Sequence, residues 1–403
     1  MVNVAILGYG TVGSGVYEVI EKNNSHISRR AGDKVNVKYV LDLREFPGDP
    51  VEKVLVHDVN VILNDPEVSV VVEVMGGVEP AHTFVKTALE SGKSVCTSNK
   101  EMVAKHGAEL LEIAKQNNCN FLYEASVGGG IPIIRPLNQS LTVDHLNQIS
   151  GILNGTTNYI LTKMSEEGLP FEEVLKDAQN KGYAERNPEA DVEGYDACRK
   201  IAILASMAYE KQVDYEDIYT EGITKITKED FEYAAKIDSS IKLLGLARKI
   251  NGKVYAMVAP FVINRDNSLY GVRGVYNAIL LNGDMLDDVM FYGRGAGKLP
   301  TASAVVSDVV DAIRHRGKII MTFWSAKKRK LGDINDFEVP FMVRVKGTGL
   351  DAEIHDAFGK VKMIESPEGI NNETAFVTKS MKGSDFEKAA KNFEVISRIR
   401  VNR

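Results

Sequence analysis

Continuous apolar runs alternate with amphipathic segments over the first third of the chain. Residues 2–7, 35–41, 65–77 and 94–97 are rich in valine and bounded by polar or glycine residues. Such runs are typical of parallel strands that are buried on both faces. The segments between them have apolar residues at helical spacing and predict helices over about residues 12–21, 80–91 and 101–117. This alternation predicts an α/β protein with a right-handed, doubly wound parallel sheet.

The pattern continues with further strands and helices downstream. Residues 149–161 predict a strand, a polar turn and a helix, and the apolar positions from Tyr195 onward predict another helix. After a basic linker at 327–330, the last segments follow a strand-helix-strand-strand-helix-strand order. They lie at about residues 341–345, 350–358, 361–366, 375–378, 385–392 and 395–401.

Glycines follow the first predicted strand in the pattern Gly8-x-Gly10-x-x-Gly13. Gly8 allows a tight turn, Gly10 lets the backbone approach a pyrophosphate, and Gly13 lets the helix lie close to the strand. The start of the next helix then faces the anion. The alternative is an ordinary glycine-rich turn, but the position between a strand and a helix favours a Rossmann-type dinucleotide site.

Asp42 and Arg44 follow the second predicted strand and favour different cofactors. An acidic residue there binds the ribose hydroxyl of NAD, whereas an arginine accommodates the extra phosphate of NADP. The nearby Lys53 shifts the expectation toward NADP without deciding it.

Lys100 follows the fourth predicted strand, in the sequence Ser98-Asn99-Lys100. Ligands of such sheets bind at the carboxyl ends of the strands. Lys100 is therefore a candidate contact for a cofactor or a substrate carboxylate, and a solvated lysine is the alternative.

Carboxylates and a lysine surround the start of the helix that begins at Tyr195. Asp196 and Lys200 are one turn apart, which by itself is also the spacing of a surface ion pair. Glu185 and Asp191 precede them in a loop that contains glycine and proline. Several carboxylates beside one ammonium would suit an amino-acid substrate, and the lysine could protonate an alkoxide that forms when an aldehyde receives a hydride.

The segment from Val127 to Pro132 contains three consecutive glycines. Its free backbone carbonyls could bind a cation, or the segment could be a simple crossover between domains. The residues alone favour the crossover.

Taken together, these motifs resemble homoserine dehydrogenases over essentially the whole chain. The matching segments are 8–13, 73–77, 98–100, 124–132, 155–160 and 181–200. The resemblance implies reversible reduction of L-aspartate 4-semialdehyde to L-homoserine with NADP(H) or NAD(H), in threonine, methionine and isoleucine biosynthesis.

The resemblance also assigns roles to residues. Lys200 would donate the proton, Glu185 and Asp196 would bind the substrate, and Asp191 would orient the reaction. Lys100 would contact cofactor and substrate. The implied cofactor-binding residues are Gly8, Tyr9, Gly10, Thr11, Val12, Gly13, Asp42, Arg44, Ser98, Lys100, Gly182 and Gly297. A monovalent cation, usually Na⁺, would bind to Glu124, Val127, Gly129 and Ile131.

The implied domains are a nucleotide-binding domain at 1–130, completed by a helix at 300–315, and an α+β substrate and dimerisation domain at 131–299. A returning helix and linker at 300–337 would lead to a βαββαβ domain at 338–403 that looks like an ACT domain. Its first turn, Gly347-Thr348-Gly349, replaces the usual Pro-Gly turn, so amino-acid feedback is no more expected than a structural role. We expect a monofunctional homodimer.

Composition restricts partners and location. A net charge of −6 gives no general attraction for nucleic acid or anionic membranes. No apolar run spans a bilayer, no leader sequence is evident, and three cysteines without C-x-x-C spacing suit the cytoplasm. The seven histidines form no H-E-x-x-H motif or comparable cluster, so no catalytic metal is expected.

Two other functions are compatible with parts of the sequence. A cysteine-dependent semialdehyde dehydrogenase would use Cys198 as its nucleophile and would need a histidine partner. A non-catalytic protein that senses nicotinamide nucleotides would keep the fold and bind a partner through the terminal module. The intact set of Glu185, Asp191, Asp196 and Lys200 argues against the sensor.

Overall fold

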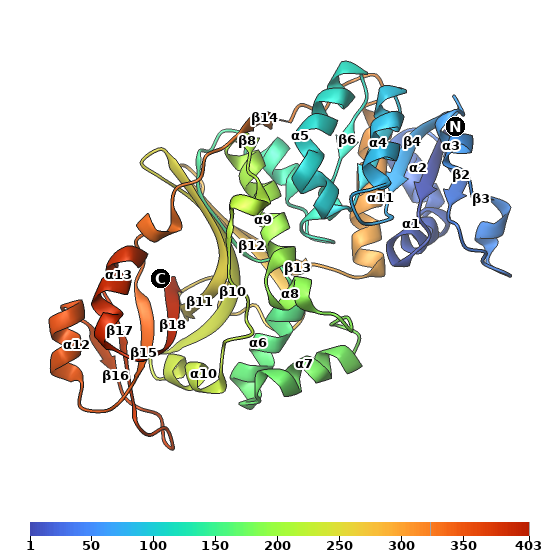
Figure 1. Ribbon diagram of the computed structural model, residues 1–403. Helices are drawn as coiled ribbons and strands as arrows, with labels where there is room; N and C mark the ends of the chain where they lie inside the picture. Colours follow the sequence, from blue (N-terminus) through green and yellow to red (C-terminus); the bar gives the residue numbers. More distant parts are fainter. Residues whose placement is uncertain (323, 403) are drawn as a thin grey trace. The chain divides into compact units, whose positions relative to one another are not determined.

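A computed structural model describes residues 1–322 and 324–402 (Figure 1). These residues form two compact units, each made from three chain segments. The first unit contains residues 1–144, 202–215 and 293–329, and the second contains residues 145–201, 216–292 and 330–403. No helix in the described ranges is long and apolar enough to cross a membrane.

The first unit is built on a parallel sheet, which confirms the predicted α/β architecture. In the described residues the sheet has six strands in the order β3-β2-β1-β4-β5-β6. The strands are β1 Val2–Leu7, β2 Val35–Leu41, β3 Leu55–Val56, β4 Val68–Glu73, β5 Ser94–Thr97 and β6 Phe121–Leu122. The order reverses direction at β1 and β4, so the carboxyl ends of these two strands form the place where such sheets bind ligands.

Helices cover this sheet. They are α1 Thr11–Lys22, α2 Asn24–Ala31, α3 Val59–Leu63, α4 Ala81–Glu90, α5 Lys100–Gln116 and, from far along the chain, α11 Lys298–Arg314. Apolar side chains of β1, β2 and β4 pack with α1 and α11 in one core. The helices α1 and α11 lie so close that a Cβ at Gly15 would be 2.9 Å from the Lys298 carbonyl oxygen.

The second unit contains a larger sheet, with ten strands in the described residues. Its main path is β13-β12-β7-β10-β11-β18-β15-β17-β16, and β9 pairs with β11. The strands are β7 Leu146–Ile152, β9 Tyr219–Thr220, β10 Ser239–Ile250, β11 Lys253–Asn264, β12 Tyr276–Gly283, β13 Asp287–Arg294, β15 Phe341–Lys346, β16 Lys362–Ile364, β17 Glu373–Val377 and β18 Val395–Asn402. The helices are α6 Gly155–Glu167, α7 Phe171–Asn180, α8 Glu189–Val192, α9 Tyr195–Ala208, α10 Lys228–Ala235, α12 Asp351–Phe358 and α13 Gly383–Ala389.

The terminal strands and helices have the predicted βαββαβ order. Their strands pair in the order β18-β15-β17-β16, all antiparallel, which is a split βαβ arrangement. Strand β18 also pairs with β11, so the terminal module continues the sheet of the middle region. Arg344, 3% exposed, pairs with Asp230 of α10 at 2.7 Å and thereby fixes the module to that region.

The basic stretch at 327–330 differs from the expected simple linker. Residues Ser325–Lys328 form β14, which pairs with the short strand β8, Lys211–Gln212. The lysine side chains of β14 remain exposed, as predicted. Asp191, expected in a loop, lies in the four-residue helix α8. After α5, the strand β6 is followed by a 3₁₀ turn at Glu124–Ser126.

The close approach of α1 to the first turn gives a stability prediction. A Cβ at Gly13 would lie 1.9 Å from the carbonyl oxygen of Gly8, which is backbone and has no room to move. We expect Gly13→Ala to lower the free energy of unfolding by about 1–3 kcal/mol, as overpacking does. Urea denaturation measures this change.

Gly10→Ala is the matched control, because a Cβ at Gly10 meets no atom within 4 Å and its φ is −82°. It should unfold near the wild-type midpoint. Equal midpoints for Gly13→Ala and Gly10→Ala would contradict the close-packing argument.

Candidate active site

Lys200 and Asp196 form a buried ion pair on α9. Their Nζ and Oδ2 atoms are 2.8 Å apart, and the side chains are only 10% and 7% exposed. The Lys200 ammonium also donates a hydrogen bond to the carbonyl oxygen of Leu153 at 2.7 Å. These contacts use two of its three N–H donors, and Lys200 makes no third hydrogen bond within the described ranges. The pair is therefore not on a solvated helix surface, and one donor remains for another group.

Asn154 connects this pair to a second carboxylate. Its Nδ2 donates to Asp191 at 2.7 Å and to Asp196 at 2.9 Å. Its Oδ1 accepts the backbone N–H of Thr157 and so caps the start of α6. One buried amide thus holds together the turn after β7, the helix α8 and the helix α9.

Two carboxylates around one ammonium give the cluster an excess of negative charge when both are ionised. Burial, and next the negative charge of Asp196, raises the pKa of Asp191 above its ordinary value. A cationic ligand such as an amino-acid ammonium would relieve this repulsion. The structure thus brings together Asp191, Asp196 and Lys200, three of the four residues singled out in this segment.

Glu185, the fourth residue, is exposed, and within the described ranges its side chain has no hydrogen bond or ion pair. Its backbone carbonyl accepts a hydrogen bond from Gln179. Gly182 is also exposed and has a φ of +71°, which ends α7. Both residues lie in the segment between α7 and α8.

The glycine-rich turn after β1 has the geometry of a phosphate-binding loop. Gly8 has a φ of +99°, and Gly10 precedes the first residue of α1 with open space around it. Thr11 is exposed, whereas the Val12 side chain packs against the core. The Tyr9 ring is buried between Tyr17 and Phe46. Backbone groups therefore dominate the exposed part of the turn, as an anion site requires.

Asp42 and Arg44 bind each other rather than acting separately. Arg44 donates from Nε and Nη2 to the two Asp42 oxygens, both at 2.9 Å. Asp42 also accepts the N–H of Arg44 and that of Tyr9, so it holds the glycine-rich turn. The Arg44 hydrogen bonds keep the pKa of Asp42 well below its usual range. The Arg44 side chain is 62% exposed and is the more movable partner.

A buried carboxylate organises the neighbouring strand ends. Glu73 at the end of β4 accepts hydrogen bonds from the Met75 N–H and the Thr97 hydroxyl. Thr97 accepts the N–H of Asn99, and Asn99 donates to the carbonyl of Gly77 and caps α5. This network sets the direction of the Ser98–Lys100 segment.

Lys100 belongs to the first compact unit and Lys200 to the second.

The glycine-rich segment after β6 is held by Glu124, which is 2% exposed. Its carboxylate accepts three backbone N–H groups, from Ile133, Ile134 and Arg135. Among the described residues, no hydrogen bond reaches the carbonyl oxygens of the buried residues Val127 and Ile131 or of Gly129. Buried carbonyl groups normally have hydrogen-bond partners, so these unpaired carbonyls favour a cation-binding segment over a simple crossover between domains.

A charged group that the sequence analysis missed lies beside this segment. Arg135 pairs with Asp308 at 2.6 Å and with Asp311 at 2.7 Å, and Asp308 accepts the Glu124 N–H. Burial, and next the negative charge of Glu124, raises the pKa of Asp308 to about 8. Asp308 and Asp311 lie one helical turn apart on α11, but at least 173 residues separate them from Arg135 in the sequence. The spacing of these residues therefore gave no signal of the contact.

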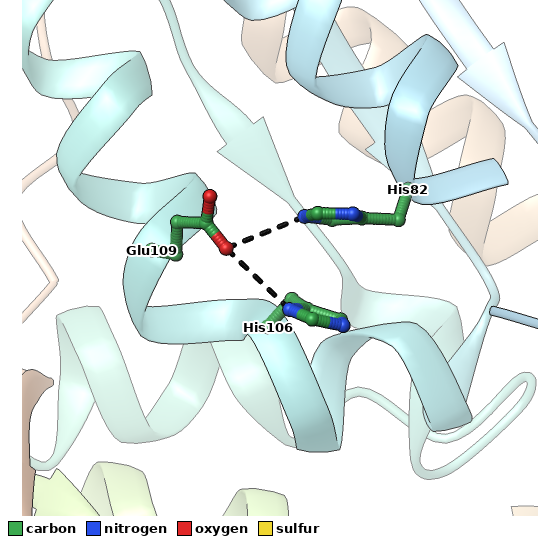
Figure 2. A group of neighbouring side chains, drawn as sticks. All are labelled: His82, His106 and Glu109. Atoms are coloured by element: carbon green, nitrogen blue, oxygen red, sulfur yellow. Dashed lines mark ion pairs between the residues drawn. The ribbon is translucent and has the colours of Figure 1, made fainter. Parts of the chain in front are cut away.

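The sequence shows no metal-binding motif among the histidines, but the structure brings two of them together with a glutamate. His82 of α4 lies beside His106 and Glu109 of α5, and their ligand atoms are within 4.8 Å of one another (Figure 2). The i,i+3 spacing of His106 and Glu109 was a readable signal. His82 comes from another helix, and only the packing of α4 against α5 brings it close.

Comparisons with known proteins agree with this geometry. Residues 8–124 match the family model "Homoserine dehydrogenase, NAD binding domain", and residues 132–310 match "Homoserine dehydrogenase". The homoserine dehydrogenase of Bacillus subtilis is 43% identical over 317 residues, 78% of this chain and 73% of that protein. That of Synechocystis is 46% identical over 318 residues, 77% and 73% of the two chains.

Solved structures give the same result. A homoserine dehydrogenase from Thiobacillus denitrificans matches with a TM-score of 0.90 and 33% identity, over 100% of this chain and 98% of that one. A hyperthermophilic archaeal homoserine dehydrogenase mutant in complex with NADPH matches with a TM-score of 0.65 and 30% identity, over 77% and 97%.

The central place of Asn154 gives a second stability prediction. Asn154→Ala removes a helix cap and two hydrogen bonds to buried carboxylates. A cap contributes about 1 kcal/mol, and hydrogen bonds to charged groups contribute about 1.5–3 kcal/mol each before relaxation. We expect a loss of about 2–4 kcal/mol in urea denaturation.

Asp58→Ala is the matched control, because Asp58 caps α3 through the Asn60 N–H and is exposed. Its loss should be about 1 kcal/mol. Equal losses in the two variants would mean that Asn154 acts only as a cap.

Proposed function

The chain belongs to the homoserine dehydrogenase family, and we propose that the buried cluster of Lys200, Asp196, Asp191 and Asn154 is its reaction centre. The protein is an NAD(P)-dependent oxidoreductase that acts on a CH–OH group. The observation that carries the proposal is the Lys200 ammonium, held by two contacts with one N–H donor left over. The reaction is the reversible reduction of L-aspartate 4-semialdehyde to L-homoserine, in the biosynthesis of threonine, methionine and isoleucine.

Lys200 is the proton donor in the direction of reduction. A bound NAD(P)H would supply the hydride, which would leave an alkoxide at the former aldehyde oxygen. The free N–H of Lys200 donates its proton to that oxygen, and in the reverse direction the neutral amine takes the proton back. The contacts of Lys200 with Leu153 and Asp196 fix the direction of the remaining donor.

The carboxylates bind and orient the substrate. Asp196 holds Lys200 and, with Asp191, provides the negative charge that attracts the substrate ammonium. Glu185 is exposed in the segment that precedes α8, from which it would reach a bound substrate. Lys100, at the start of α5, binds cofactor and the substrate carboxylate.

The cofactor binds at the carboxyl ends of β1, β4 and β5. The backbone groups of the turn that contains Gly8, Tyr9, Gly10, Thr11, Val12 and Gly13 receive the pyrophosphate. Ser98, Lys100, Gly182 and Gly297 complete the proposed contacts, and Gly297 begins α11 with a φ of +123°.

The cofactor is proposed to be NADP(H). Asp42 already accepts hydrogen bonds from Tyr9 and Arg44 on both oxygens and has little capacity left for a ribose hydroxyl. The exposed Arg44 guanidinium can turn toward the extra phosphate of NADP.

A monovalent cation, Na⁺ by resemblance, is proposed to bind to the Glu124, Val127, Gly129 and Ile131 segment. The unpaired carbonyls of Val127, Gly129 and Ile131 support this assignment. Arg135 pairs with Asp308 and Asp311, and its backbone N–H binds to Glu124, so acidic groups outnumber the guanidinium beside this segment. The cation would stabilise the segment that connects β6 to β7.

The terminal module is proposed to be an ACT-like domain with a structural role. Its split βαβ topology supports the likeness. Strand β18 continues the sheet of the middle region, and Arg344 forms a buried ion pair with α10. These contacts favour a structural role of the module over feedback control.

A homodimer is proposed through the sheet of the second unit, whose edge strand β13 exposes Met290 and Tyr292. Cytoplasmic location is proposed on the basis of the three buried, unbridged cysteines.

Lys200→Ala tests the reaction centre. We expect turnover to fall by about 10²–10⁴-fold, the usual range for a positioned acid or base, with nearly unchanged cofactor affinity. Homoserine-dependent formation of reduced cofactor measures turnover, and cofactor fluorescence measures affinity.

Lys163→Ala is the matched control, because Lys163 pairs with Glu167 at the same i,i+4 spacing on α6, and both side chains are more exposed than those of the buried pair. Its turnover should stay near that of the wild type. Near-normal turnover of Lys200→Ala would remove Lys200 from the proposed role.

A comparison of NAD and NADP in sodium, potassium and tetramethylammonium buffers tests the cofactor and cation proposals. We expect a higher kcat/KM with NADP, because Arg44 can pair with the extra phosphate, and higher activity with Na⁺ than with the bulky organic cation. Preference for NAD would overturn the assignment of Arg44. Equal activity in all three buffers would overturn the cation site. Turnover with neither cofactor, in protein that binds both, would favour the nucleotide sensor.

A further inference from the structure

Two imidazoles and a carboxylate meet between helices α4 and α5, away from the residues of the proposed reaction. The Nε2 atom of His82 is 3.3 Å from Glu109 Oε2, and the Nδ1 atom of His106 is 3.4 Å from the same oxygen. Figure 2 shows both rings pointing one nitrogen toward Glu109. The rings are stacked, with centroids 3.9 Å apart and an angle of 21° between their planes.

The distance of each histidine nitrogen from Glu109 is that between ligands around one small cation. In tetrahedral zinc sites the metal lies about 2.0–2.2 Å from nitrogen and oxygen ligands, which places neighbouring ligand atoms about 3.3–3.5 Å apart. The two distances to Glu109 fall in this range. Two histidines and one carboxylate are also a common ligand set for zinc when the fourth position holds water.

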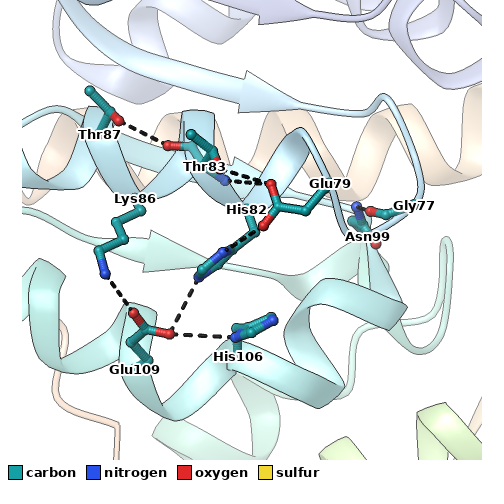
Figure 3. A network of polar contacts seen from close by, with 9 residues as sticks. All are labelled: Gly77, Glu79, His82, Thr83, Lys86, Thr87, Asn99, His106 and Glu109. Carbon is teal, nitrogen blue, oxygen red and sulfur yellow. Dashed lines mark hydrogen bonds and ion pairs between the residues drawn. The ribbon is translucent and has the colours of Figure 1, made fainter.

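The outer contacts of His82 point the same way. Glu79 lies 3.1 Å from the Nδ1 atom of His82, the other ring nitrogen (Figure 3). A carboxylate at this position accepts the Nδ1 proton and leaves the lone pair on Nε2, as in the carboxylate-histidine pairs of zinc sites. The Nε2 atom is buried and has no hydrogen-bond partner among the described residues, despite its 3.3 Å approach to Glu109.

His106 is also suited to bind a metal. Its side chain is 24% exposed, so solvent reaches it, and its Nδ1 atom lies 3.4 Å from Glu109 Oε2.

We propose that His82, His106 and Glu109 form a binding site for a divalent cation of the zinc type, with a fourth position open to water. Lys86 opposes binding, because its ammonium lies 2.9 Å from Glu109 Oε1, and the charge of Lys105 also acts on His106. Lys86 contacts the oxygen that faces away from the histidines, so Oε2 remains available.

The site would act as a clamp between two helices that begin at the ligand-binding edge of the sheet. Glu79 and His82 adjoin the turn after β4, and Asn99 at the start of α5 donates to Gly77 in that turn (Figure 3). A cation bound to both helices fixes their relative positions and stabilises the folded state through its binding energy. No catalytic role follows from this position.

Titration of the purified full chain with Zn²⁺, in competition with a chromophoric chelator, tests the site. We expect one high-affinity site in the wild type and its loss in His106→Gln and Glu109→Gln. Glu79→Gln should weaken binding by about 10–100-fold, the usual effect of losing an outer carboxylate. Lys86→Met should tighten binding, because it removes the competing ammonium.

His57→Gln is the matched control, because His57 lies 3.1 Å from Glu45 in an exposed pair outside the set of potential metal ligands. Its affinity should equal that of the wild type. Co²⁺ in place of Zn²⁺ should give the visible absorption of a tetrahedral site in the wild type and not in His106→Gln.

Equal Zn²⁺ affinity in the wild type, His106→Gln and Glu109→Gln would overturn the proposal, as would absence of binding in both the wild type and Lys86→Met. In either case the cluster is only a hydrogen-bonded contact between helices. Zn²⁺ affinity should rise in Lys86→Met and fall in Glu109→Gln. Misfolding can only lower the affinity, so the rise in Lys86→Met separates metal binding from misfolding.

Discussion

The buried carboxylate of Glu124 is the interaction on which the organisation of the first unit depends. Three backbone N–H groups that follow it bind to this one side chain, and its own N–H binds to Asp308 of α11. A helix that starts almost 300 residues into the chain is thereby fixed to the sheet formed by the first 122 residues. A buried charge destabilises the folded state unless it is fully hydrogen-bonded. The residues around Glu124 must therefore keep these hydrogen bonds for the unit to fold. The glycine-rich turn after β1 is positioned partly through α11, because α11 packs on α1.

The same rule accounts for the contacts of the proposed reaction centre. Lys200 and Asp196 have the spacing of an exposed helix pair, which contributes only about 0.3–0.5 kcal/mol. Burial changes the character of the pair, because each charge then needs further partners. Leu153 supplies a carbonyl to the lysine, and Asn154 supplies an amide to the carboxylate. These two consecutive residues connect the end of β7 to the start of α6, so the sheet itself sets the direction of the lysine.

Much of the architecture could be predicted from the sequence, because periodicity reports local structure. The strands β1, β2 and β5 have the predicted bounds, and the βαββαβ order of the terminal region was readable. The long hairpin of β10 and β11 was not predicted, since its residues are buried along most of their length and show no clear alternation. At the site, the pairing of Lys200 with Asp196 could be predicted from their spacing on α9. The mutual pairing of Asp42 and Arg44 could not, because the same two side chains can face a cofactor or each other.

Contacts between distant segments define the limit of such reasoning. His82 and His106 are in helices that pack side by side, and their proximity depends on the rotation of each helix about its axis as well as on its existence. A rotation of α4 by one residue, about 100°, would move His82 off the face that meets α5. The apolar residues Ala81, Val85, Ala88 and Leu89 fix that rotation, since they are fully buried and leave His82 one position beyond Ala81. The core therefore determines which polar side chains meet at its edge, and a polar cluster between helices is a consequence of packing that no single segment encodes.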